Sequence, residues 1–268
     1  MSPTRLVSIG LAALLGLARP AGAHDFWIEP SSYRPAAGSV LRVHLRVGGQ
    51  FEGDLVPRRD ELIERFELQT PSRRVPVAGV DGVNPAGWVT IDGPGTYTLS
   101  YQSRGSRVEL PSDRFESYLR EEGLERVIER RAARGASGTV GRERFFRCAK
   151  SLVLAGGGSF QPAARSGLTL ELVPRFDPTR VHPGEPLPVT LLFRGRPIEG
   201  ARVTLLAKGD PFEANAQRTD RRGEATLTST AGGPYLLKAV WMEPAAAGSD
   251  VDWESWWASL DFDVTAAR

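Results

Sequence analysis

The chain has 268 residues, with 34 lysines and arginines, 32 aspartates and glutamates, three histidines and one cysteine. One cysteine excludes an intrachain disulfide, and it also excludes the zinc sites that need two or more cysteine ligands. The single dense basic run, residues 125–147, is interleaved with glutamates and is interpreted as a solvated helix face. Because nucleic-acid binding needs a concentrated basic surface, no nucleic-acid partner is predicted.

Residues 1–23 have the three parts of a secretory signal peptide. Arg5 gives a positive start, residues 6–17 are apolar, and Ala21-Gly22-Ala23 is a small-residue cleavage site. The apolar run is shorter than the roughly 20 residues that span a bilayer. The sequence therefore predicts a periplasmic protein that begins at His24 and has no membrane span after cleavage. The predicted signal contains two arginines, Arg5 and Arg19, and no acidic residue. Without it, 32 basic and 32 acidic residues remain, and the net charge is zero.

Residues 24–110 and 167–268 have the pattern of β-sandwiches. In the first segment, the leucines and valines at odd positions of 41–47 share one face and His44 lies on the other. In the second, short strands are separated by turn residues at intervals of about 8 to 12 residues. Residues 34–49 and 87–103 also resemble 181–195 and 223–240. We therefore predict an all-β chain of two related sandwich-like units, immunoglobulin- or transthyretin-like.

Residues 111–155 have a different pattern and are predicted as a short helical insertion between the two units. Apolar residues recur at helical spacing after Ser112 or Asp113, either of which is a suitable N-cap. The later part of the segment is predicted as another short helix that runs into a strand. Residues 156–166 are predicted to be the linker to the second unit.

His24 is the most distinctive candidate for chemistry, because signal cleavage would give it a free α-amino group beside its imidazole. The two groups titrate near neutral pH, at roughly 7.7–8.0 and 6.5, so one metal ion can displace both protons. Such nitrogen ligands suit Cu(II), Ni(II) and Zn(II). Asp25 is a candidate oxygen ligand or hydrogen-bond acceptor, and His44 a candidate third nitrogen. The alternative is that His24 only begins the first strand.

The remaining candidates have plain structural interpretations as well. His44 is interpreted as an exposed strand residue, and His182 as a residue of a surface turn. Cys148 is interpreted as a small buried apolar residue. The cluster of Trp253, Trp256 and Trp257 is either a stacking platform for a sugar or part of a core. In the core interpretation, Trp257 covers the second sandwich together with Leu260 and Phe262.

Several motifs together resemble an exported bacterial family of unknown function. They are AHDFWIEP at 23–30, RFESYLREEGL at 114–124, RERFFRCAKSLV at 142–153 and DWESWWASLDFDV at 252–264. Members of this family are linked to the periplasmic, substrate-specific component of nickel or cobalt uptake. Residues 184–241 are also similar to transthyretin-like modules, through GRPIEGARV at 195–203 and TDRRG at 219–223.

The resemblance implies an accessory binding protein rather than an enzyme, and it places a histidine at the mature N-terminus, here His24. The first hypothesis is therefore a periplasmic protein that binds nickel, cobalt or copper and works with a membrane transporter component. The second is an interaction or carbohydrate-binding module without metal. The third is a copper-dependent oxidase with an N-terminal histidine brace, which needs a second histidine close to His24.

Overall fold

The structure, a computed structural model, describes residues 24–70, 72–157, 165–177, 180–210 and 215–264. The first unit contains a 3-10 turn (Asp60–Leu62) and β1 (Asp25–Pro30), β2 (Val40–Gly49), β3 (Glu52–Val56), β4 (Ile63–Gln69), β5 (Arg74–Pro76), β6 (Gly87–Thr90), β7 (Gly95–Ser103) and β9 (Gly141–Ala155). The second contains β10 (Leu170–Pro174), β11 (Pro186–Phe193), β12 (Arg196–Pro197), β13 (Arg202–Ala207), β14 (Asn215–Arg218), β15 (Glu224–Thr228), β16 (Gly233–Pro244) and β17 (Trp253–Val264). Between β7 and β9 lie β8 (Ser106–Leu110), α1 (Ser112–Glu121) and α2 (Glu125–Ala133).

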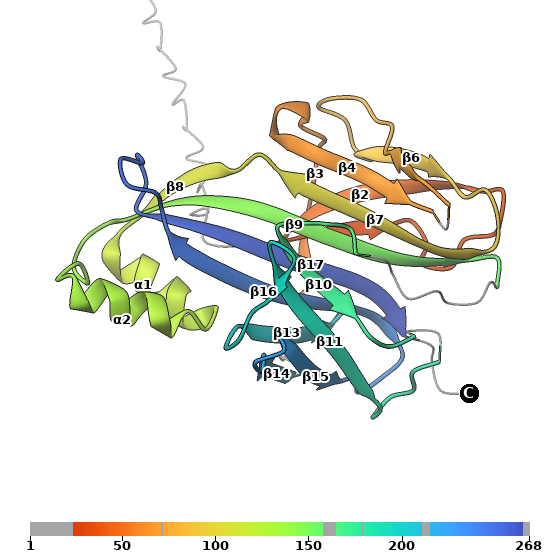
Figure 1. Ribbon diagram of the computed structural model, residues 1–268. Coiled ribbons are helices and arrows are strands. Elements are labelled where there is room, and N and C mark those ends of the chain that lie inside the picture. Colours follow the sequence, from red (N-terminus) through yellow and green to blue (C-terminus); the bar gives the residue numbers. More distant parts are fainter. Residues whose placement is uncertain (1–23, 71, 158–164, 178–179, 211–214, 265–268) are drawn as a thin grey trace, which may run out of the picture.

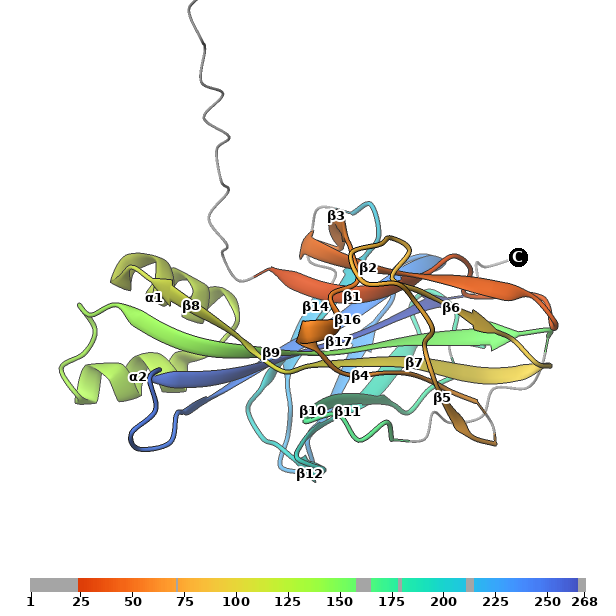
Figure 2. The same ribbon diagram turned by 90° about the horizontal axis from the view of Figure 1, so that it is seen from above.

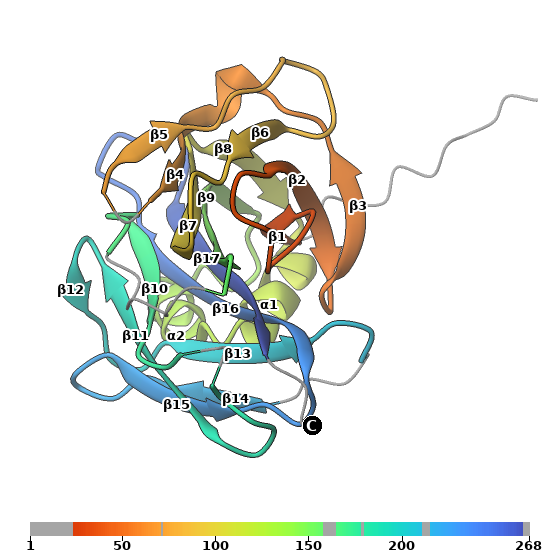
Figure 3. The same ribbon diagram turned by 90° about the vertical axis from the view of Figure 1, so that its right-hand side faces the viewer.

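The all-β prediction is confirmed, and the two units have the same strand pairing. In the first unit, β2 pairs with β1, β3 and β6, and the facing sheet has the order β5-β4-β7-β9. In the second, β11 pairs with β10, β12 and β15, and the facing sheet has the order β14-β13-β16-β17. The last strands, β9 and β17, pair in parallel and join both facing sheets into one nine-stranded sheet. Figure 3 shows the first unit above the second.

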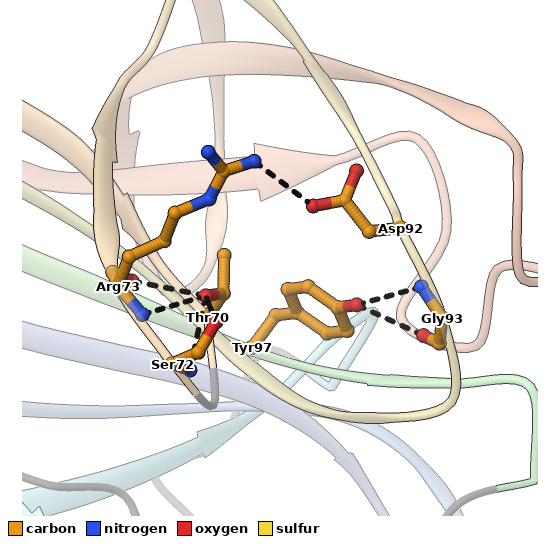
Figure 4. A network of polar contacts seen from close by, with 6 residues as sticks. All are labelled: Thr70, Ser72, Arg73, Asp92, Gly93 and Tyr97. Atoms are coloured by element: carbon orange, nitrogen blue, oxygen red, sulfur yellow. Dashed lines mark hydrogen bonds and ion pairs between the residues drawn. The ribbon is translucent and has the colours of Figure 1, made fainter.

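Equivalent tyrosine corners support the relation between the units. The Tyr97 hydroxyl donates to the Gly93 carbonyl (2.9 Å) and accepts from its N–H (3.1 Å). The Tyr235 hydroxyl makes the same pair of bonds with Ala231, at 3.0 and 2.9 Å. In Figure 4 the first corner lies beside Arg73, whose guanidinium reaches Asp92 at 3.2 Å. A tyrosine bonded to backbone upstream is a recurrent feature of immunoglobulin-type sandwiches.

The later part of residues 111–155 is predicted as a short helix that runs into a strand. The strand is present, but the helix is wrong, because residues 141–155 form the single strand β9. Two short helices do form, but they end at Ala133, well before the end of the segment predicted as helical. Ala149 and Val153 face the core of the first unit, whereas Cys148 and Leu152 face the core of the second. A strand buried on both faces loses the alternation of apolar and polar residues that identifies a half-buried strand. Its sequence therefore looked helical.

The tryptophan cluster is buried in two different cores. Trp256 packs in the second sandwich, with its ring centroid 5.5 Å from that of Phe146. Trp253 and Trp257 pack on the opposite face, against the helices, and all three tryptophans are at most 6% exposed. The predicted grouping of Trp257 with Leu260 is wrong, because residues three apart in a strand face opposite sides of the sheet. The buried rings also cannot serve as an exposed sugar platform.

The two helices lie against one end of the long sheet, near the ends of β8, β9, β16 and β17 (Figures 1 and 2). Within the part of the chain that the structure describes, no helix has the length and apolar character needed to cross a bilayer. The predicted signal peptide, residues 1–23, lies outside the described residues. So do residues 158–164 of the predicted linker.

Candidate functional site

A cleft of about 620 Å³ opens where the two units and α1 meet, and His24 lies on its wall. We call it the N-terminal cleft. Its walls come from the start of β1, the β2–β3 turn, α1, β13 and β16. The residues that line it include His24, Asp25, Gln50, Tyr118, Glu122 and Lys238.

The main chain of His24 is held by an arginine from β9. The Arg147 guanidinium donates to the His24 carbonyl oxygen, while the His24 side chain is exposed. The same guanidinium lies 4.9 Å from the ring centroid of Phe145 and 5.2 Å from that of Trp257. Burial lowers the pKa of Arg147, although the carboxylates of Asp25 and Glu143 oppose this effect. This anchor fixes where the main chain enters β1.

Asp25 is buried beside His24 and shares a lysine with the end of α1. The Lys238 ammonium lies 2.8 Å from an Asp25 carboxylate oxygen and 2.9 Å from one of Glu122. Burial alone would lower the pKa of Lys238, but the two carboxylates outweigh it and raise that pKa. Burial raises the pKa of Glu122, against the opposing effect of Lys238. One ammonium therefore joins the first strand, the helical insertion and the second unit.

A second buried carboxylate network lies behind the cleft wall. Glu143 of β9 accepts hydrogen bonds from the hydroxyls of Tyr118 (3.1 Å) and Ser255. The Trp257 indole N–H donates to Ser255 (3.0 Å), and its ring stacks on Tyr118 at 5.5 Å. Burial raises the pKa of Glu143 and, together with that carboxylate, the pKa of Tyr118. The network holds α1 on the sheet and so fixes one wall of the cleft.

The charged side chains that line the cleft beside His24 balance. Three of them are the carboxylates of Asp25, Glu121 and Glu122, and three are the cations of Arg114, Arg202 and Lys238. When all six are ionised, the lining has no net charge.

The turn beside the cleft has an unusual backbone. Gln50 and Phe51 connect β2 to β3 with φ values of 54° and 58°. Two-residue turns of this kind usually contain Asn and Gly, and each larger residue costs roughly 1–2 kcal/mol. Phe51 is 1% exposed and packs edge-on against Trp27 at 5.4 Å, which offsets part of the cost. The strained turn places Gln50 on the cleft wall.

The structure does not bring the three predicted metal ligands together. Asp25 follows His24 directly, but its carboxylate is engaged by Lys238. His44 pairs across the strands with Glu29, roughly 13 Å along β1 from Asp25, and its Nδ1 contacts the Asn84 side chain at 2.9 Å. No three His, Cys, Asp or Glu side chains in the described ranges form a group that could hold a metal ion.

The third histidine does not supply a brace either. His182 lies in the loop before β11, in the second unit, where its backbone N–H donates to the Glu185 carboxylate at 2.9 Å. Neither His44 nor His182 is among the residues that line the N-terminal cleft with His24. The histidine-brace hypothesis therefore has no second histidine in this cleft.

Sequence reasoning missed the groups that surround His24. Lys238 interrupts the apolar stretch YLLKAVW, and Glu143 and Arg147 interrupt RERFFRCAK. A charged residue within a buried strand needs a partner, so these interruptions were the available signal. The partners themselves are far apart in the sequence, as with Glu122 and Lys238, which are 116 positions apart.

Comparison with protein families matches residues 21–243 to the family described as "Domain of unknown function (DUF4198)". No curated protein matches the chain. Among solved structures, similar chains include the D0-D1 domain of Intimin (14% identity, 90% of this chain and 98% of that one, TM-score 0.22). Another is the human OSCAR ligand-binding domain (12% identity, 87% of this chain and 95% of that one, TM-score 0.20). A third contains three N-terminal domains of the bacteriophage RB49 Hoc capsid protein (9% identity, 90% of this chain and 71% of that one, TM-score 0.24). These TM-scores are too low to support an argument about function.

Proposed function

The chain belongs to the DUF4198 family of domains of unknown function. We propose that this member of the family is a periplasmic binding protein for a divalent transition metal. His24 is the metal-binding residue in this proposal, and the ligand is nickel or cobalt, with copper as a third candidate. The observation that carries it is the position of His24, which lies on the wall of the N-terminal cleft beside the cluster of Asp25, Lys238 and Glu122.

The proposed chelate uses the α-amine and the imidazole of His24. Both groups belong to one residue, so one metal ion closes a small ring with them at little cost in conformational entropy. Both nitrogens must be unprotonated to bind the metal, so protons compete with it and affinity falls as pH is lowered. Signal cleavage directly before His24 is therefore part of the proposal.

Two nitrogen ligands leave coordination positions on the metal for water or for another molecule. The described residues offer no further group of side-chain ligands at this place. A metal held in this way is accessible from the cleft and can pass to a second protein. This suits an accessory protein that delivers the ion to a membrane transporter component, which is the partner that we propose.

Metal titration of protein that begins at His24 tests the proposal. We expect one Ni(II) or Co(II) ion per chain, with affinity falling as pH is lowered from 8 to 6. The matched control carries one alanine ahead of His24, which turns the amine into a peptide nitrogen and leaves the rest of the chain unchanged. Equal affinity in the two proteins, or no binding by the first, contradicts the proposal.

A further inference from the structure

A second pocket, of about 840 Å³, opens at the end of the long sheet where the helices lie (Figures 1 and 2). Its walls include the loop from α2 to β9, residues 134–140, and the hairpin loop from β16 to β17, residues 245–252. We call it the hairpin pocket. It shares no lining residue with the N-terminal cleft. Its volume lies in the range of about 300–1,000 Å³ that is typical of small-molecule sites.

Much of the lining of the hairpin pocket is apolar. Residues 244–247 have the sequence Pro-Ala-Ala-Ala, and Val140 comes from the loop before β9. Val140 is 48% exposed, and Ala246 and Ala247 are exposed as well. An apolar chain bound here removes these side chains from water, which stabilises the complex.

The hairpin loop is held in place by ion pairs with β9. The Arg142 guanidinium donates two hydrogen bonds to the Asp252 carboxylate, at 3.0 and 2.9 Å. Arg144 donates to Asp250 at 3.0 Å. The Asp252 carbonyl also accepts from the Ala245 N–H across the loop, at 2.9 Å. These contacts make the wall of the pocket before any ligand arrives.

A buried arginine of α2 also lines the hairpin pocket. Arg131 is 2% exposed, donates to the Thr139 carbonyl at 2.8 Å, and lies 4.9 Å from the ring centroid of Phe115. Its Nε has no hydrogen-bond partner, and within the described ranges no ion pair joins it to a carboxylate. A guanidinium has five N–H donors, and a buried charge is costly unless it is paired. Arg131 therefore lacks the anionic partner that a buried guanidinium needs.

The charges of the lining favour an anion. They are the cations of Arg131, Arg134 and Arg142 and the carboxylates of Glu109 and Asp252, so their sum is one positive charge when all are ionised. Arg142 and Asp252 neutralise each other through their two hydrogen bonds, which leaves two cations and one carboxylate. A carboxylate is the anion that matches the planar fork of a guanidinium.

We propose that the hairpin pocket binds a small organic carboxylate with an apolar chain. The carboxylate pairs with the Arg131 guanidinium, and the chain packs against Val140 and the alanines of the hairpin loop. This site is separate from the N-terminal cleft, so the inference does not depend on metal binding at His24.

Hexanoate is the probe that tests the proposal, and hexanamide, with the same chain and no charge, is its matched control. Calorimetric titration should give one hexanoate per chain, and amide chemical shifts should change at Thr139 and Ala246. Acetate lacks the apolar chain and should bind at least about tenfold more weakly. Hexanamide that binds as tightly as hexanoate, or shift changes that lie elsewhere, would overturn the proposal.

Two arginines of α2 provide a matched pair of variants. Arg131→Met should weaken hexanoate binding about tenfold or more, because it removes a hydrogen bond between charged groups. Arg130→Met makes the same change of charge at an exposed residue outside the pocket, and its affinity should stay within about twofold of the original. Equal affinities of the two variants contradict the proposal.

Val140→Asp tests the same site without altering a buried residue. It places a negative charge at an exposed position on the wall of the pocket and should weaken hexanoate binding about tenfold by repulsion and by loss of apolar contact. Circular dichroism checks that the variant is folded. An unchanged affinity in the folded variant shows that hexanoate does not bind in the hairpin pocket and overturns the proposal.

Discussion

Lys150 and Lys238 are both lysines of the nine-stranded sheet that meet carboxylates inside the molecule, yet their surroundings differ. Lys150 contacts Glu171 at 3.0 Å, and the two side chains are only 1% and 3% exposed. Glu171 also accepts hydrogen bonds from the backbone N–H groups of Ser166 (2.6 Å) and Gly167 (2.9 Å). Lys238 instead lines the N-terminal cleft between two carboxylates.

The difference shows that a buried charge does not by itself identify a functional site. Burial lowers the pKa of Lys150 despite its single carboxylate partner, whereas two carboxylates raise the pKa of Lys238. The Lys150–Glu171 pair fastens the start of the second unit to β9, and neither residue lines the N-terminal cleft. The cluster of Asp25, Lys238 and Glu122 instead lines a cleft, where another molecule can reach its charged groups, as a binding site requires.

Lys150→Met should have the largest effect on folding. It leaves the Glu171 carboxylate buried without its cation, and breaking a buried pair in this way costs about 3–5 kcal/mol. Urea unfolding at neutral pH measures this loss. The double variant Lys150→Met, Glu171→Gln should recover part of it, because the amide removes the uncompensated charge. If Lys150→Met lowered the free energy of unfolding by less than Lys238→Met does, the two lysines would not differ in the way their surroundings predict.

Lys238→Met should cost less, about 1.5–3 kcal/mol, the range for hydrogen bonds to charged groups. The pH dependence of the two lysines should have opposite signs. The raised pKa of Lys238 gives a stabilisation that is fully present below the unfolded value of about 10.4 and is lost as pH rises through the folded value. The lowered pKa of Lys150 makes the folded protein gain stability as pH rises from its folded value toward the unfolded value of about 10.4.

Unfolding curves between pH 7 and pH 11 test this difference in sign. The gap between the original protein and Lys238→Met should narrow at the alkaline end, and the gap to Lys150→Met should widen. If both gaps changed in the same direction with pH, the two lysines would have equivalent surroundings, and the difference drawn between them would be wrong.

The sequence predicted the strands that are apolar on one face and polar on the other, such as β2, and the equivalence of the two units. It predicted a strand only at the end of residues 111–155 and missed the rest of β9, which has core residues on both faces. By contrast, His24 could be identified as a candidate from the sequence, because the prediction depends only on its position directly after the expected cleavage site. The roles of Lys238 and Glu122 follow from contacts between distant strands and a helix end, which local periodicity does not contain.

Lys208→Met should have the smallest effect, about 0.2–1 kcal/mol, as measured for exposed ion pairs. Burial would raise the pKa of Glu29, but hydrogen bonds from Lys208 and Arg46 outweigh it and lower that pKa. The stabilisation from Glu29 is therefore present above its unfolded value of about 4.3 and is lost as pH falls through the folded value. Arg46 still pairs with Glu29 in the variant, so most of this acid sensitivity should remain. Urea unfolding at pH 7 and pH 3 measures both quantities, and a loss as large as that of Lys238→Met would mean that both ends of β1 are held equally.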